Sequence, residues 1–209
     1  MPRPRTIADE VLLDAALEII HRSGPSRLSF ATLAERVGLA ASTLVQRFGT
    51  KEALLRGALL RAWDRLDADT TAAIEAASPD AAGVIDLLVA LSGQYDAHDY
   101  AEQLLVLRED LRDPVLRTRG ATWIDTLAAA VESRLVDAPG GPDGLGVQVV
   151  AQWQGTLTVW SFTRPGRVDV VVRRALEDLL ARLVDSPNRS LIARNELACR
   201  RARPLDPGA

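Results

Sequence analysis

The feature that most constrains the fold of this chain is an apolar periodicity of about 3.6 residues that recurs along nearly its whole length. Near the N-terminus, two adjacent rows of apolar side chains repeat at four-residue spacing. These rows are Ile7, Val11, Ala15 and Ile19, and beside them Leu12, Ala16 and Ile20. Such a stripe is typical of an amphipathic α-helix with one buried face. Because no segment of useful length alternates in the manner of a β-strand, the sequence predicts an all-α fold.

Capping residues, glycines and prolines mark where the predicted helices begin and end. Ser23-Gly24-Pro25 ends the first helix, and Ser29 and Thr50 are expected N-caps. The helices that follow the first are expected over about residues 30–37, 41–48 and 51–77. Further along, Ser78-Pro79-Asp80 and Asp113-Pro114 each place a capping residue before a proline at the first helical position. Two closing helices are expected over about residues 145–163 and 168–184, after a Pro- and Gly-rich loop.

Charge is distributed unevenly along the chain. Residues 1–51 contain seven basic and five acidic side chains, whereas the remainder contains 18 basic and 23 acidic ones. A basic segment on an acidic body is typical of a nucleic-acid-binding head on a solvated domain. We therefore predict a DNA-binding domain over residues 1–50, a helical effector and dimerisation domain over 51–186, and a C-terminal extension over 187–209.

Several protein classes are disfavoured by composition. The strongest apolar run, residues 84–91, is short and is interrupted by Asp86, so we expect no membrane span. The basic N-terminus leads into no apolar h-region, which argues against a signal peptide. Because Cys199 is the only cysteine, an internal disulfide framework is excluded. These features predict a cytoplasmic protein that needs no cofactor.

Residues 29–48 resemble a helix-turn-helix in their pattern of small, apolar and polar side chains. Gly38 supplies the backbone freedom that a tight turn needs, and Ala34 is small where two helices would cross. Leu33, Val37, Leu39, Leu44 and Phe48 are expected to close a small core. Ser42, Thr43, Gln46 and Arg47 would then face outward from the second helix. Short polar side chains and glutamine can reach base edges in the major groove, so this helix is the candidate recognition helix.

Two strings within this region, and the helices around them, resemble the TetR family of bacterial transcriptional regulators. The strings are Leu-Ala-Glu-Arg-Val-Gly-Leu at residues 33–39 and Ser-Thr-Leu-Val-Gln-Arg-Phe-Gly-Thr-Lys-Glu-Ala-Leu-Leu at residues 42–55. The resemblance covers residues 6–60 closely and extends beyond them only in architecture. It implies an N-terminal three-helix DNA-binding domain and a C-terminal helical bundle that binds a ligand and dimerises.

The resemblance also implies which residues contact DNA. By position, those that match phosphate contacts of the family are Ser29, Thr43, Arg47 and Lys51. Those that match base-edge contacts are Ala41, Ser42, Val45 and Gln46. The chain departs from the family at Val45, where an aromatic residue is usual, and at Arg47, where Tyr or His is usual. Arg3 and Arg5 resemble the basic arm that some members lay in the minor groove; a solvated chain end is the alternative.

The predicted effector domain holds most of the aromatic side chains. Candidate ligand-lining residues are Trp63, Tyr95, Tyr100, Trp123, Trp153 and Trp160, although the favoured alternative for each of them is an ordinary core position. His98 and Glu102 are spaced i, i+4, but two ligands do not complete a metal site, so we predict none.

The two closing helices are apolar on more than one face, which requires a second packing partner. Their apolar residues include Val149, Val150, Trp153, Leu157, Trp160, Val170, Val171, Leu176, Leu179, Leu180 and Leu183. In the TetR family such a pair packs against its copy in a dimer. We therefore expect a homodimer through residues 147–184, with Gly155 permitting close helix approach.

Taken as a whole, the sequence predicts a repressor that binds a palindromic operator as a dimer and is released by a small apolar molecule. The alternative is a helical ligand-binding or adaptor protein that has lost DNA binding. No Gly-x-Ser-x-Gly elbow, phosphate-binding glycine loop or His-Glu-x-x-His motif is present, so we do not expect an enzyme.

Overall fold

A computed structural model of the chain describes residues 7–92, 97–136 and 144–185. These residues form α-helices, one short 3₁₀ helix and no β-strand, which confirms the predicted all-α fold. The helices are α1 (Asp9–Ser23), α2 (Phe30–Val37), α3 (Ala41–Phe48), α4 (Lys51–Ala76), α5 (Ala81–Ser92), α6 (Ala97–Arg112), α7 (Pro114–Glu132), α8 (Leu145–Thr163) and α9 (Val168–Asp185). None of them is long and apolar enough to cross a membrane.

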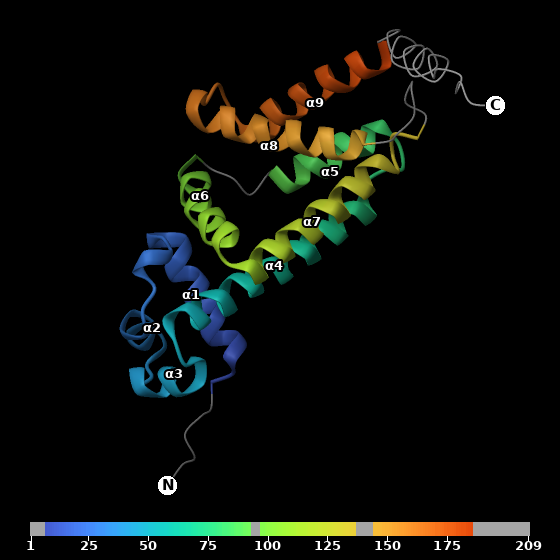
Figure 1. The fold of residues 1–209 in the computed structure, drawn as a ribbon. Helices are drawn as coiled ribbons and strands as arrows, with labels where there is room; N and C mark the ends of the chain where they lie inside the picture. The colour runs from blue at the N-terminus through green and yellow to red at the C-terminus, as the bar shows by residue number, and fades with distance from the viewer. Residues whose placement is uncertain (1–6, 93–96, 137–143, 186–209) are drawn as a thin grey trace, which may run out of the picture.

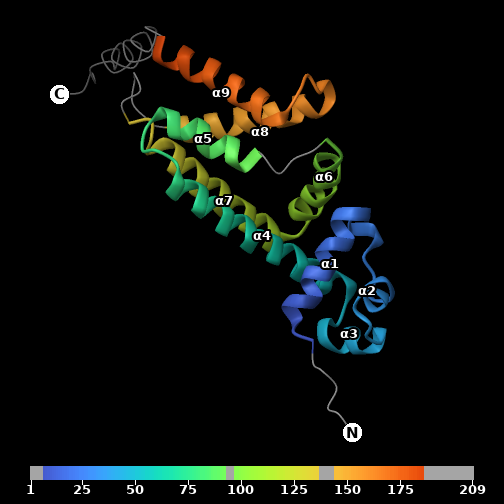
Figure 2. The same cartoon turned by 180° about the vertical axis from the view of Figure 1, so that it is seen from behind.

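Helices α1, α2 and α3 gather at one end of the molecule, and α5, α8 and α9 lie at the other (Figure 1). The long helix α4 runs from the first group to the second, with α7 beside it in both views (Figure 2). Helix α6 lies between the two ends and contacts α1, α7 and α8. Helices α4 and α6 therefore connect the two ends directly, and a movement of either helix can be transmitted from one end to the other.

The predicted N-caps hold in three places. Ser29 and Thr50 accept hydrogen bonds from the backbone N–H groups of Thr32 and Ala53, at 3.1 Å each. Asp113 caps α7 by accepting from Val115 N at 2.9 Å, with Pro114 at the first helical position. At α5 the prediction was wrong by two residues, because the helix begins at Ala81. There Asp80 accepts from Gly83 N at 3.0 Å.

The N-terminal helices enclose a first group of buried apolar residues, here called the head core. Its members are Leu12, Ala16, Leu17, Ile20, Leu28, Leu33, Ala34, Leu44, Leu54, Ala58, Leu59 and Leu116. Of the two predicted rows on α1, the row of Leu12, Ala16 and Ile20 is buried, whereas Val11 is exposed. Periodicity predicted the apolar stripe on α1 but not which of its two rows is buried. The buried row is determined by the helices that pack against α1, which are α2, α4 and α6.

A second group, the body core, is built mainly from α5, α7, α8 and α9. Three indoles form a chain inside it: the ring centroids of Trp63 and Trp123 are 6.0 Å apart, and those of Trp123 and Trp153 are 6.4 Å apart. Trp63 packs against both the head core and the body core. This indole therefore stands at the junction between the two ends of the molecule.

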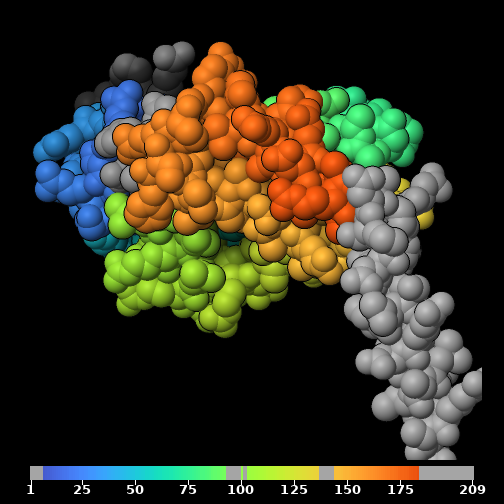
Figure 3. All heavy atoms as spheres, turned by 90° about the horizontal axis from the view of Figure 1, so that it is seen from above, coloured from blue at the N-terminus to red at the C-terminus, as the bar shows by residue number. Residues whose placement is uncertain are grey.

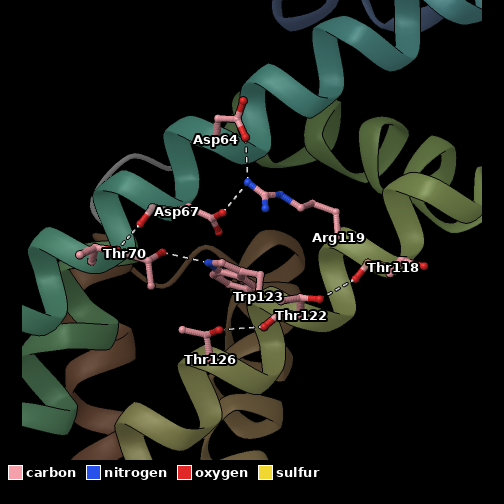
Figure 4. Close-up of polar contacts among 9 residues, drawn as sticks. Asp64, Asp67, Thr70, Thr118, Arg119, Thr122, Trp123 and Thr126 are labelled. Atoms are coloured by element: carbon pink, nitrogen blue, oxygen red, sulfur yellow. Dashed lines mark hydrogen bonds and ion pairs between the residues drawn. The ribbon is translucent and has the colours of Figure 1, made fainter.

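Polar contacts also hold α7 against α4 at this junction (Figure 4). Arg119 of α7 donates to Asp64 at 2.7 Å and forms an ion pair with Asp67 at 2.6 Å. One turn further on, Trp123 Nε1 donates to Thr70 Oγ1 at 2.9 Å inside the core. Since Trp123 and Thr70 are buried, α4 and α7 are joined by a dry contact as well as by an exposed ion pair.

Most of the apolar side chains that were predicted to need a second packing partner on the closing helices are buried within the chain itself. Val149, Val150, Trp153, Leu157 and Trp160 are all buried in the body core, so they do not form a free face, and that part of the expectation was wrong. The outward face of α8 carries a different stripe of small and apolar residues: Val147, Ala151, Gly155, Val159 and Phe162. Helices α8 and α9 cover the near surface when the molecule is viewed from above (Figure 3). This outward set of α8 residues is called the α8 stripe below.

Candidate DNA-binding surface

The α2–turn–α3 unit has the geometry of a helix-turn-helix. Gly38 ends α2 in the left-handed region with φ +69°, and both its own N–H and that of Leu39 donate to the carbonyl of Ala34. Leu33 and Leu44 are fully buried beneath the turn. The crossing of the two helices is therefore fixed by a glycine conformation and by a small apolar core.

Helix α3 turns one face away from this core. Ala41, Ser42 and Gln46 are exposed, and Val45 has 43% of its surface accessible. Thr43 is only half-buried beside them. These exposed side chains are the ones expected at base edges, so the structure brings the predicted base-reading residues together on one surface.

Arg47 is placed differently from its prediction as a free outward cation. Its side chain is 24% exposed, and Nη1 donates to the backbone carbonyl of Ile7 at 2.5 Å and to Asp9 Oδ1 at 3.1 Å. It therefore ties α3 to the start of α1. Sequence reasoning missed Asp9 because a contact across 38 residues leaves no local pattern.

The other predicted phosphate ligands are also held in place by local contacts. Ser29 Oγ is engaged in the capping box of α2, where Thr32 Oγ1 accepts in return from Ser29 N at 3.0 Å. Lys51 extends from the first turn of α4, and its Nζ donates to the carbonyl of Ser26 at 3.2 Å. Since Lys51 stays exposed, its charge is available to a phosphate without any rearrangement of the backbone.

A second pair of contacts orients the recognition unit on α4. Asp14 of α1 forms ion pairs with Arg61 and Arg65 of α4, and Arg61 Nη2 donates to Asp14 Oδ2 at 3.1 Å. The hydrogen bond from Arg61 holds the pKa of the Asp14 carboxyl below its usual range. The sequence did not predict the contact between Asp14 and Arg61 either, because charged residues far apart in the chain are ordinarily expected to be solvated.

We expect Asp9→Asn to strengthen binding to double-stranded DNA. The change removes one negative charge from the surface and the charged partner of Arg47, which keeps its hydrogen bond to the carbonyl of Ile7. Because Asp9 no longer neutralises its charge, Arg47 should act on a phosphate and make the slope of log K against log salt steeper by about 0.9. Fluorescence anisotropy over a salt series measures both effects. Glu10→Gln is the matched control, because it removes the same charge from the same helical turn without a contact to Arg47. Equal slopes in the two variants would show that Arg47 does not act on a phosphate.

The predicted ligand-lining residues fall into three groups. Trp123, Trp153, Trp160 and Tyr100 are buried, and Trp63 is half-buried. Each described indole N–H has an acceptor, for example Trp153 with Ser92 Oγ at 2.7 Å and Trp160 with the carbonyl of Gly166 at 2.9 Å. Tyr100 contacts Thr158 Oγ1 at 2.8 Å. Tyr95 lies outside the described residues.

Sequence reasoning did not single out Asp110, a buried carboxylate of α6 that accepts a hydrogen bond from Trp63 Nε1 at 3.1 Å. Burial raises the pKa of its carboxyl, and the nearby charge of Glu109 adds to the shift against the opposing effect of the Trp63 hydrogen bond. The side chains of His98 and Glu102 lie outside the described residues, as does Cys199. Within the described part of the chain, no three His, Cys, Asp or Glu side chains group as metal ligands.

Comparison with known protein families agrees with the helix-turn-helix geometry of the N-terminal helices. Residues 12–58 match the family described as bacterial regulatory proteins, tetR family. This range begins within α1 and ends within α4, so it contains the whole α2–turn–α3 unit. A search of curated proteins by sequence found no match.

Solved structures share the fold over most of the chain. A transcriptional regulator from Rhodococcus sp. Rha1 is 16% identical, with a TM-score of 0.69 over 87% of this chain and 100% of its own. A putative transcriptional regulator from Saccharomonospora viridis, solved with choline, is 20% identical, with a TM-score of 0.66 over 81% and 93%. The multidrug binding protein EbrR, solved with proflavin, is 21% identical, with a TM-score of 0.58 over 80% and 96%. At these identities the likeness establishes the fold alone.

Proposed function

Because its N-terminal domain places this chain in the TetR family of bacterial regulatory proteins, we propose that it is a ligand-responsive repressor of transcription. It binds a palindromic operator in double-stranded DNA as a homodimer, acts in the cytoplasm and has no catalytic role. One observation carries the proposal: the outward face of α3 presents Ala41, Ser42, Val45 and Gln46 together, inside the segment that matches the family. Lys51 adds an exposed positive charge at the start of α4, where its Nζ donates to the carbonyl of Ser26.

We assign DNA binding to residues 1–50, effector binding and dimerisation to 51–186, and a C-terminal extension to 187–209. The head core and the body core are separate clusters, and the start of α4 belongs to the first, because Leu54, Ala58 and Leu59 are buried in the head core. The α8 stripe supports the dimer: Val159 is 61% and Phe162 84% exposed, and the position of a Cβ on Gly155 is open space. A two-fold dimer presents two copies of α3 to one face of DNA, which matches a palindromic site.

A small, mostly apolar effector is proposed to act through the junction at Trp63. The relatives solved with choline and with proflavin support a ligand-binding role for this fold. An effector shifts the protein between two arrangements only if it binds them with different affinity. Since α4 runs through both cores, a ligand that reorients α4 changes the separation of the two heads. The rival reading is a ligand-binding or adaptor protein that has lost DNA binding.

Fluorescence anisotropy separates these readings. The wild type should bind DNA from upstream of its own gene more tightly than random duplex, with a steep negative salt slope. Gln46→Ala should cost about 1–3 kcal/mol on the specific DNA and little on random duplex. Lys51→Ala should weaken both and reduce the salt slope by about 1.

Arg112→Ala is the control for lost charge, because Arg112 is exposed on the last turn of α6 and away from α3. It should leave both affinities unchanged. If the folded wild-type protein binds neither duplex at low salt, the repressor proposal fails and the adaptor reading takes its place.

A further inference from the structure

Asp110 differs from the other carboxylates near the junction. Asp64 and Asp67 pair with Arg119, and Asp113 pairs with Arg56 at 2.6 Å. Asp110 is only 8% exposed, yet no ion pair reaches it from the described residues. Among the described residues, arginines therefore pair with these three more exposed carboxylates, and none pairs with Asp110.

A buried carboxylate without a cation is costly to maintain. The hydrogen bond from Trp63 Nε1 satisfies one position on Oδ1 and brings no positive charge. The charge of Glu109, which is also negative, adds to the raised pKa of the Asp110 carboxyl. A carboxylate kept in such surroundings is a candidate site for a positively charged ligand.

The surroundings of Asp110 suit an organic cation in particular. Trp63 is half-buried, and its Nε1 lies 3.1 Å from Asp110 Oδ1. The six-membered ring of the indole packs closely against Gly120, where an added Cβ would lie 3.3 Å from Trp63 Cζ2. Trp123 follows at 6.0 Å between centroids. An indole face attracts cations, and a large, weakly hydrated organic cation loses the least hydration free energy when it binds there.

We propose that the effector site includes Asp110 and Trp63 and that it selects organic cations, with Asp110 as the counter-ion and the indole as the apolar contact. This inference rests on the proposed function, since it names the class of effector. It also explains how the ligand could change DNA binding. Trp63 belongs to α4 and packs against both cores, so a cation held between α4 and α6 acts directly on the junction.

The test compares cations with neutral molecules of the same shape. Isothermal titration measures binding of choline against 3,3-dimethyl-1-butanol, and of benzyltrimethylammonium against neopentylbenzene. The wild type should prefer the cation of at least one pair by about ten-fold or more. Asp110→Asn should abolish that preference, because the amide still accepts from Trp63 but carries no charge. Glu109→Gln, which removes a more exposed charge one residue away, should retain it.

Thermal unfolding of each variant shows that the fold is intact; Asp110→Asn should unfold no earlier than the wild type, because it removes a buried charge. Equal affinity of the wild type for the cation and its neutral partner in both pairs overturns the inference without any variant. So does an unchanged cation preference in Asp110→Asn. DNA binding is measured on the same preparations: if it is intact while cation selectivity is absent, only this inference fails, and if it is absent, the proposed function fails.

Discussion

Val159→Glu is expected to convert the proposed dimer to a monomer and to weaken operator binding by roughly 10²–10⁴-fold. The side chain belongs to the α8 stripe and is 61% exposed, so the change leaves the body core intact. In a two-fold dimer each stripe meets its own copy, which brings two added carboxylates close together in an apolar interface. Two linked heads bind a palindrome far more tightly than one head does, so the loss of the dimer removes most of the affinity.

Light scattering after size exclusion measures the mass, and anisotropy measures the affinity. The mass should fall to that of one chain, 22.6 kDa. Val115→Glu is the control: Val115 is 50% exposed, but it lies on the first turn of α7, away from the stripe. It should leave both mass and affinity unchanged. A Val159→Glu protein that remains dimeric would show that the interface lies elsewhere.

Gly146→Ala is expected to lower the free energy of unfolding by about 3 kcal/mol. Helices α7 and α8 pack closely at this residue, where an added Cβ would overlap the backbone carbonyl oxygen of Ala128 and lie 2.9 Å from its carbon. A backbone group cannot turn aside as a flexible side chain can. The start of α8 is also held by Glu132, whose carboxylate accepts from the N–H groups of Gly144 and Gly146 at 3.3 Å each. Displacement of α8 would weaken both bonds.

The matched control is the same substitution in the same helix. Gly155 has open space at its Cβ position, so Gly155→Ala should raise the free energy of unfolding by about 0.5–1 kcal/mol through helix propensity. Urea unfolding in the Val159→Glu background compares the two, because unfolding is then not coupled to dissociation of a dimer. Equal effects of the two substitutions would mean that α7 and α8 are not packed as described.

Much of the fold follows from local sequence. Apolar periodicity and caps such as Ser29, Thr50 and Asp113 placed the helices, because these signals act within one or two turns of the chain. The recognition unit was predictable for the same reason: Gly38, the small core around Leu44 and the outward face of α3 all lie within 20 residues. The exposed positions Ala41, Ser42, Val45 and Gln46 follow from helical geometry alone.

Only the tertiary structure decided which partners these residues meet. It tied Arg47 to Asp9, placed the predicted α8 surplus inside the body core, and left residues of the α8 stripe such as Val159 exposed. It also buried Asp110 against Trp63 without a cation. The physical reason is the range of the interactions: helix periodicity and capping depend on neighbours a few residues away, whereas burial and ion pairing depend on segments brought together from 38 to 47 residues apart.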